Sequence, residues 1–113
     1  MARLISAERF DGNVRQVCAS SKGVVRLVSF SATRRVARLR AYLVDFSFVD
    51  IYYNQKTGTT TFAHIQRNRR VFGADNKNGI WHWHPREDPS EHLPSNREII
   101  FEEFLKEIEK TMK

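Results

Sequence analysis

The chain has 113 residues, of which 41% are hydrophobic, and a formal net charge of +6 at pH 7. This length predicts one domain over residues 1–113, large enough to bury a single core. The single cysteine excludes an intramolecular disulfide, and the longest apolar run, residues 41–44, is far too short for a membrane span or a signal peptide. We therefore expect a cytoplasmic protein that does not enter a membrane.

The charge is divided unevenly along the chain. Residues 1–70 carry 13 Lys and Arg against 4 Asp and Glu, whereas residues 71–113 carry 6 against 9. Arginine outnumbers lysine 13 to 6, and its planar guanidinium group suits phosphate and carboxylate partners. The basic part therefore indicates a nucleic acid or an acidic protein as the partner.

Periodicity and turn residues predict the following helices and strands, in chain order. The first 22 residues fit either a short helix or a strand. From residue 24 onward, β-branched and aromatic runs separated by turn signals predict an antiparallel meander of about five or six strands. The expected strands cover residues 24–30, 36–44, 46–53, 59–66 and 71–74, followed by a segment rich in Trp and His.

The strand at residues 36–44 alternates most clearly. Ala37, Leu39, Ala41 and Leu43 fall on one side of it. We expect this side to pack against a helix and the other side to be exposed to solvent and positively charged. The residues on that other side are Arg38, Arg40 and Tyr42.

At the C-terminus the apolar residues recur at steps of three and four, which is typical of an amphipathic helix. Ser95 and Glu98 have the spacing of a capping box, although residues 99–101 fit a short extended segment before a helix that begins near Phe101. The predicted fold is α+β, a twisted antiparallel sheet with this helix packed on one face. The helical stripe contains Ile100, Phe101, Phe104, Leu105, Ile108 and Met112.

Residues 75–85 gather two tryptophans and two histidines after a turn signal. In an extended segment, His82 and His84 point to one face and Trp81 and Trp83 to the other. A histidine pair suits acid/base catalysis near neutral pH, above an aromatic floor that could clamp a nucleotide. The ordinary alternative is an edge strand with surface histidines and tryptophans in the core.

A second alternative for these histidines is a zinc site. His82 and His84 would then supply two ligands, with His64, Asp75 or His92 as the third. The rest of the chain has no ligand spacing of this kind, so we predict neither a metal nor another cofactor. Asp75 is also read as a turn residue together with Asn76, because such side chains bond nearby backbone amides.

The arginines are candidates for binding a nucleic acid. Arg67, Arg69 and Arg70 fall at a predicted hairpin tip, and Arg38 and Arg40 lie on a strand with Tyr42 placed to stack on a base. We expect these charges to be exposed, unpaired and joined in one positive region. The ordinary alternative for the hairpin tip is a solvated turn that protects a sheet edge.

Four short motifs lie within roughly residues 36–110. They are His64-x-Gln66, the run Arg69-Arg70-Val71-Phe72 leading into Asp75-Asn76, the Trp/His/Pro cluster, and the closing Phe-Glu-Glu-Phe-Leu-Lys-Glu-Ile helix. Together these motifs resemble the TumE-type toxin family of prokaryotic toxin–antitoxin pairs. The resemblance implies a small cytoplasmic protein with a sheet-plus-helix fold, and a helix-turn-helix antitoxin as its partner.

The leading hypothesis is a toxin that cleaves RNA without a metal. His82 or His84 would remove the proton of a 2′-hydroxyl, the other histidine would protonate the leaving 5′-oxygen, and Arg69 or Arg70 would stabilise the phosphate. The alternatives are a non-enzymatic module that binds a nucleic acid or an acidic partner through the arginine face, and a metal-binding domain at the histidines. Assembly into a homo-oligomer stays open at this stage.

Overall fold

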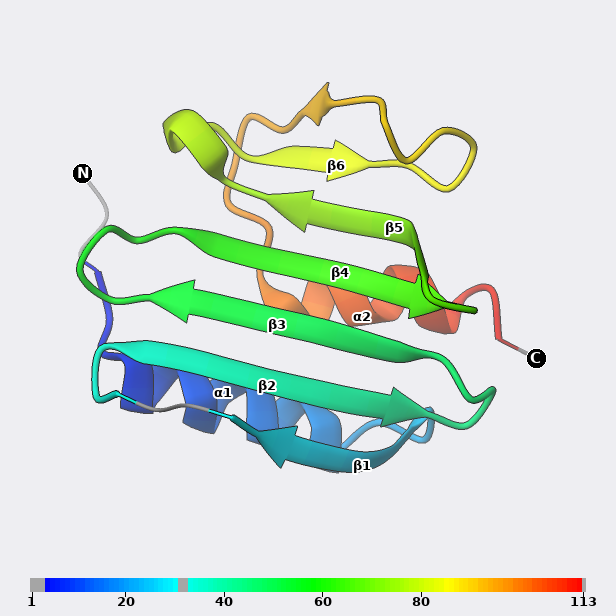
Figure 1. The fold of residues 1–113 in the computed structure, drawn as a ribbon, viewed down its shortest axis with the longest axis horizontal. Helices are drawn as coiled ribbons and strands as arrows, with labels where there is room; N and C mark the ends of the chain where they lie inside the picture. Colours follow the sequence, from blue (N-terminus) through cyan, green and yellow to red (C-terminus); the bar gives the residue numbers. More distant parts are fainter. Residues whose placement is uncertain (1–3, 31–32, 113) are drawn as a thin grey trace.

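Across the residues that the computed structural model describes, 4–30 and 33–112, the chain forms one antiparallel sheet of seven strands with two helices on one face (Figure 1). The strands lie side by side in chain order, which makes the sheet a meander. The predicted α+β fold is confirmed. The strands are β1 (Val24–Ser29), β2 (Val36–Leu43), β3 (Phe48–Asn54), β4 (Thr60–Gln66), β5 (Arg69–Asp75), β6 (His82–His84) and β7 (Leu93–Pro94).

The number of strands is slightly higher than the five or six predicted. The additional strand is β7, two residues that pair with His82 and Trp83 of β6. Two residues are too few to show an alternating pattern, and one of them is Pro94, which a strand accepts at the edge of a sheet.

The hairpin tip between β4 and β5 is shorter than predicted. Only Arg67 and Asn68 form the turn, with φ angles of 51° and 64°, whereas Arg69 and Arg70 already belong to β5. Positive φ at both turn residues matches the twist of the flanking strands in a two-residue hairpin.

Helix α1 (Ala7–Ala19) occupies the N-terminal segment that the sequence left open. Ser6 caps this helix, because its hydroxyl accepts a hydrogen bond from the Arg9 backbone N–H at 3.0 Å. Its apolar stripe is narrow, which explains why composition alone did not reveal it. The buried residues of α1 are Ala7, Phe10, Val14 and Cys18.

Helix α2 (Phe101–Glu109) begins where the second of the two sequence interpretations placed it. The capping box at Ser95 is wrong, since the Ser95 hydroxyl donates to the Arg97 carbonyl at 2.8 Å. The chain stays extended through Ile100 because the side chain of Ile99 is buried in the core. No helix within the described residues is long and apolar enough to cross a membrane.

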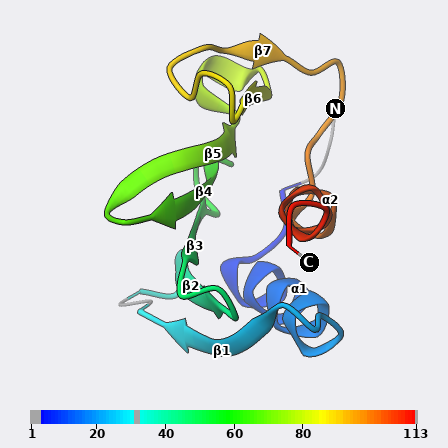
Figure 2. The same cartoon turned by 90° about the vertical axis from the view of Figure 1, so that its right-hand side faces the viewer.

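The two helices divide one face of the sheet between them (Figure 2). Helix α1 lies against β1, β2 and β3, and helix α2 lies against β4 and α1. Leu39, Phe104 and Ile108 are all buried, as the alternation in β2 and the stripe of the C-terminal helix predicted. Because both helices use the same face, the other face of the sheet carries no helix.

The core under α2 is largely aromatic. The Phe104 ring lies 5.3 Å from the Phe62 ring, 5.0 Å from Phe72 and 6.3 Å from Trp83, measured between centroids. Trp81 stacks against Phe62 in the same layer. Both tryptophans therefore belong to the helix-covered side of the sheet, opposite the two histidines of β6.

Candidate nucleic-acid interface

The face of the sheet opposite α1 and α2 is called the uncovered face. On this face the strand register arranges side chains in three rows that cross the sheet. Each row takes one residue from each of β2 to β5 and one from β1 or, for Phe30, from directly after it, because paired residues point to the same side. The rows are Arg26, Tyr42, Phe48, Ile65 and Arg70; Val28, Arg40, Asp50, Ala63 and Gly73; and Phe30, Arg38, Tyr52, Thr61 and Asp75.

Across these rows, Arg26, Arg38 and Arg40 each lie over an aromatic ring of the neighbouring strand. A guanidinium group over an aromatic ring gains from the negative face of the ring, which orders the long arginine side chain. The uncovered face therefore presents cations that are already oriented. The distances from the guanidinium carbon to the ring centroid are 5.7 Å for Arg26 and Tyr42, 4.7 Å for Arg38 and Tyr52, and 4.0 Å for Arg40 and Phe48.

Arg40 and Arg70 are engaged within the protein, so the expectation that all of the predicted arginines are unpaired is wrong. Arg40 Nε donates to Asp50 Oδ1 at 2.7 Å and Arg40 Nη2 donates to Asp50 Oδ2 at 3.2 Å, since Asp50 lies directly opposite on β3. Arg70 Nη2 donates to the Pro89 carbonyl at 2.8 Å. Each guanidinium group keeps further N–H donors beyond these bonds.

A hollow of about 220 Å³ lies within the face, where small side chains of β4 leave space. Thr61 and Ala63 form its low floor, and Arg38, Tyr52 and Asp50 stand around it. Aromatic surface, a cation and an acceptor carboxylate thus meet in one shallow depression.

The histidines of β6 share the uncovered face, as strand alternation predicted. His82 pairs with Asp75 and His84 pairs with Gly73, both at the end of the rows. Glycine is needed at position 73, because a Cβ atom there would lie 3.3 Å from Arg70 Cδ and 3.1 Å from the Phe62 carbonyl oxygen. Arg70 and His84 therefore lie together above Gly73.

The two histidines differ in access to solvent, because His84 is 2% exposed whereas His82 is half-buried. His84 Nε2 donates to Asp75 Oδ2 at 2.7 Å, and Nδ1 donates to the Glu91 carbonyl at 3.1 Å. Both ring nitrogens therefore lie within hydrogen-bond distance of an acceptor oxygen, which fixes the ring on two sides. The loop that follows β6 closes over this ring.

Asp75 is the buried counter-charge of His84. Burial alone would raise the pKa of Asp75, but the hydrogen bonds from His84 and from the Lys77 backbone N–H outweigh it and lower that pKa. The predicted turn role of the Asp75-Asn76 pair agrees with this geometry, because Asp75 Oδ1 accepts from Lys77 N at 3.1 Å. Asp75 therefore stabilises the turn that follows β5 and fixes the position of the His84 ring.

His92 is the histidine that the sequence interpretation undervalued. Its ring is exposed and meets the His82 ring edge-on at 5.5 Å and the His84 ring at 4.5 Å. Nothing in the sequence signalled this, because the contact depends on the path of residues 85–92. His82 is half-buried, and its Nδ1 is buried without a hydrogen-bond partner among the described residues.

The zinc alternative does not assemble around the residues proposed for it. His64 lies on the helix-covered side of β4, across the sheet from His82 and His84. Among the residues that the structure describes, no group of three or more His, Cys, Asp or Glu side chains could hold a metal ion. His64 therefore cannot complete a shell with the β6 histidines.

His64 instead belongs to a buried polar network at one end of the sheet. Arg86 Nη2 donates to His64 Nδ1 at 3.1 Å, so the ring proton is on Nε2, which donates to Ser47 Oγ at 2.9 Å. Ser47 Oγ and Ser47 N both donate to Asp45 Oδ1. This order is not that of a catalytic triad, because the carboxylate binds the serine rather than the imidazole.

The network keeps His64 neutral. Burial, together with the positive charge of Arg86, lowers the pKa of His64 to about 4 against the weaker opposite effect of Asp45. Burial of Asp45 would raise its pKa, but the hydrogen bonds from Ser47 outweigh that effect and lower it. The network thus ties the β2–β3 turn, strand β4 and the segment after β6 together.

Arg67 and Arg69 lie apart from the rows. They line an open cleft at the end of the sheet that carries the His64 network, together with Asp45, Phe46 and Gln66. Both arginines are exposed, as predicted, but they do not share the uncovered face with Arg38 and Arg40.

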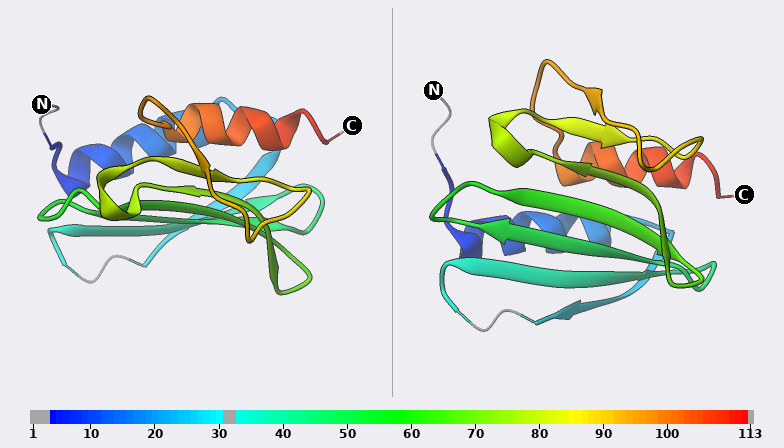
Figure 3. Two further views of the ribbon diagram at one scale, coloured as in Figure 1. Left: turned by 90° about the horizontal axis from the view of Figure 1, so that it is seen from above. Right: turned by 45° about the horizontal axis from the view of Figure 1, so that its top comes forward.

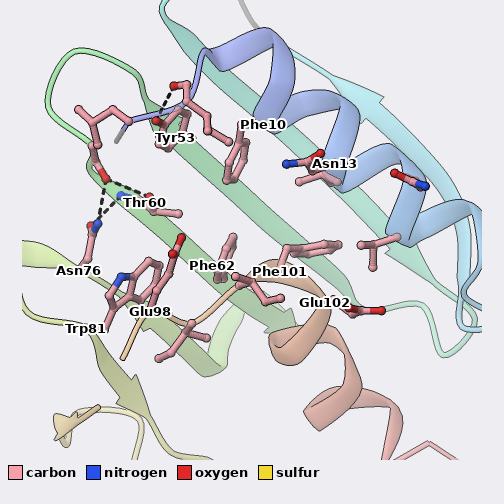
Figure 4. Close-up of a pocket in the computed structure, with 18 of the residues that line it drawn as sticks. Phe10, Asn13, Tyr53, Thr60, Phe62, Asn76, Trp81, Glu98, Phe101 and Glu102 are labelled. Carbon is pink, nitrogen blue, oxygen red and sulfur yellow. Dashed lines mark hydrogen bonds between the residues drawn. The ribbon is translucent and has the colours of Figure 1, made fainter. Parts of the chain in front are cut away.

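A groove of about 810 Å³ runs between the two helices (Figure 4). Phe10 of α1 and Phe101 of α2 face each other across it, with Trp81 at one end. Asn76 closes that end, since its Nδ2 donates to the Gly58 carbonyl at 2.8 Å. The position of Trp81 here and of Trp83 in the core places both predicted stacking residues away from the arginine rows.

Fold and surface together define a small α+β protein with a basic, aromatic sheet face. The family model described as Toxin TumE matches residues 7–112, and this chain belongs to that family. It is therefore a toxin-like protein of a toxin–antitoxin system, which implies a cognate antitoxin as its partner. No curated protein and no solved structure gave a significant match.

The first prediction concerns His84. Replacing it with alanine leaves Asp75 buried without its counter-charge, so His84→Ala should lower the free energy of unfolding by about 3 kcal/mol. Urea denaturation measures this loss. His92→Ala, at the exposed neighbouring ring, should cost less than about 1 kcal/mol. Equal stability of the two variants would contradict the structural role of His84.

The second prediction concerns the pH dependence of stability. The folded pKa of His64, about 4, lies below its ordinary value of 6.5, so the unfolded chain binds the extra proton first as the pH falls. The free energy of unfolding should drop between about pH 6.5 and pH 4, by on the order of 3 kcal/mol from this group.

His64→Gln should flatten this part of the pH profile, because glutamine keeps a neutral donor and acceptor. Urea denaturation at a series of pH values is the measurement, with His92→Gln as the control that should retain the slope. An unchanged slope in His64→Gln would show that other groups cause the loss.

Proposed function

We propose that this toxin acts on RNA, which it binds over the uncovered face of its sheet and cleaves without a metal ion. The observation that carries the proposal is the stacking of three guanidinium groups on aromatic rings across that face. Guanidinium groups bind phosphates, and aromatic rings stack on bases. Such a target would place the protein in the cytoplasm.

The hollow between Arg38 and Tyr52 is the proposed binding site of one base. The Tyr52 ring offers a stacking surface, Arg38 a contact for the adjacent phosphate, and the Asp50 carboxylate an acceptor for base amino groups. Arg40 and Tyr42 extend this surface toward the next row.

For cleavage we propose His82 and His92 in place of the original pair of His82 and His84. His82 takes the proton of a 2′-hydroxyl, whose oxygen attacks the phosphorus and breaks the bond to the 5′-oxygen. His92 gives a proton to that leaving oxygen, and Arg70, which lies above Gly73, stabilises the phosphate. The products are a 2′,3′-cyclic phosphate and a 5′-hydroxyl.

The third prediction tests binding. Fluorescence anisotropy with a labelled RNA oligonucleotide at several salt concentrations should give an affinity that falls steeply with salt. Arg38→Gln should lower the log–log slope by about one, since one phosphate contact is lost. Arg9→Gln, on the exposed side of α1, should leave the slope unchanged. Identical slopes in both variants would rule out the uncovered face.

The fourth prediction tests cleavage. His82→Ala and His92→Ala should each abolish growth inhibition in cells and the appearance of 2′,3′-cyclic phosphate ends, while thermal unfolding of both variants stays near that of the wild type. RNA binding without any turnover in the wild-type protein would favour a non-enzymatic binding module instead.

A further inference from the structure

Phe46 is the most unusual residue on the surface. It lies in the turn between β2 and β3, with 98% of its surface exposed and a φ angle of 71°. The left-handed region is normally taken by Gly or Asn, and a bulky residue there is strained. Full exposure of a phenylalanine is unfavourable as well.

The surrounding structure holds this strained turn in place. Leu43 N donates to the Ser47 carbonyl at 2.9 Å, and Phe46 N donates to the Leu43 carbonyl at 3.1 Å. Ser47 is fixed in turn by Asp45 on one side and by His64 on the other. Strain of this kind persists where the environment over-determines it, and it is concentrated at functional positions.

Two cations lie across the cleft from Phe46. Arg67 and Arg69 line the cleft from the β4–β5 hairpin, which bends away from the helices (Figures 2 and 3). Within the described part of the chain, neither guanidinium group has a hydrogen bond or an ion pair. An exposed ring beside two available guanidinium groups matches a nucleotide, which combines a flat base with flanking phosphates.

We propose that Phe46, Arg67 and Arg69 hold one unpaired nucleotide of the RNA, and that the substrate of this toxin is therefore single-stranded. The base stacks on the Phe46 ring, and the flanking phosphates contact Arg67 and Arg69. A duplex hides its base faces, so it cannot make the stacking contact. This inference rests on the proposed action on RNA and names the class of RNA.

Asp45 is the carboxylate of the same cleft and would repel a phosphate placed against it. Its Oδ1 already accepts two hydrogen bonds from Ser47, and Gln66 Nε2 lies 3.4 Å from its Oδ2. The remaining acceptor position suits an amino group of a base. The base therefore lies toward Asp45 and the phosphates lie toward the arginines.

The test compares a labelled single-stranded RNA 12-mer with its blunt duplex, by fluorescence anisotropy. The variant is Phe46→Asn, because asparagine accepts a positive φ and keeps the turn. We expect wild type to prefer the single strand, and the variant to bind that strand about tenfold more weakly with little change for the duplex. Its thermal stability should be equal to that of wild type or higher. Ile80→Asn, at another exposed apolar residue, should change neither affinity.

Equal binding of the two RNAs by wild type, or unchanged binding by Phe46→Asn, would overturn the inference. So would a variant that loses self-association or antitoxin binding while its RNA affinity is kept, because Phe46 would then be a protein contact. If binding responds to Arg38→Gln but not to Phe46→Asn, only this inference fails. If wild type shows no salt-dependent RNA binding, the proposed function fails with it.

Discussion

Every second residue of a strand in this sheet must face away from the helices, because successive side chains alternate and both helices cover the same face. The core and the surface therefore depend on the same register. Leu39 is buried under α1, which obliges Arg38 and Arg40 to project to the other side. A shift of one residue in β2 would exchange these side chains and destroy both the core and the arginine rows.

The two buried histidines of this protein hold the structure together, and the two more exposed histidines are the pair proposed for catalysis. His84 ties the loop after β6 to Asp75, and His64 joins Arg86 to Ser47. Both rings have all their nitrogen atoms engaged. A buried polar group with complete hydrogen bonds specifies one arrangement of the loops around it, since any other arrangement would leave charges or dipoles unpaired.

The two proposed contacts with RNA differ in how the protein prepares them. On the uncovered face, aromatic rings order the guanidinium groups, and the rigid sheet sets their spacing. At the end of the sheet, a buried network holds Phe46 in a conformation that a phenylalanine would not choose. Both arrangements reduce the freedom that binding would otherwise remove, which is the physical meaning of preorganisation.

The sequence by itself determined the fold class, the alternation of β2, the amphipathic C-terminal helix and the family resemblance, since all of these are local patterns along the chain. The sequence also predicted that the histidines of β6 and the two tryptophans lie on opposite faces of the sheet. Tertiary structure alone decided that a loop buries His84 while His92 stays exposed, that Asp50 pairs with Arg40, and that His64 faces the helices. These outcomes depend on contacts between segments far apart in the chain, and burial and hydrogen bonding, rather than residue type, set what a histidine or an arginine can do.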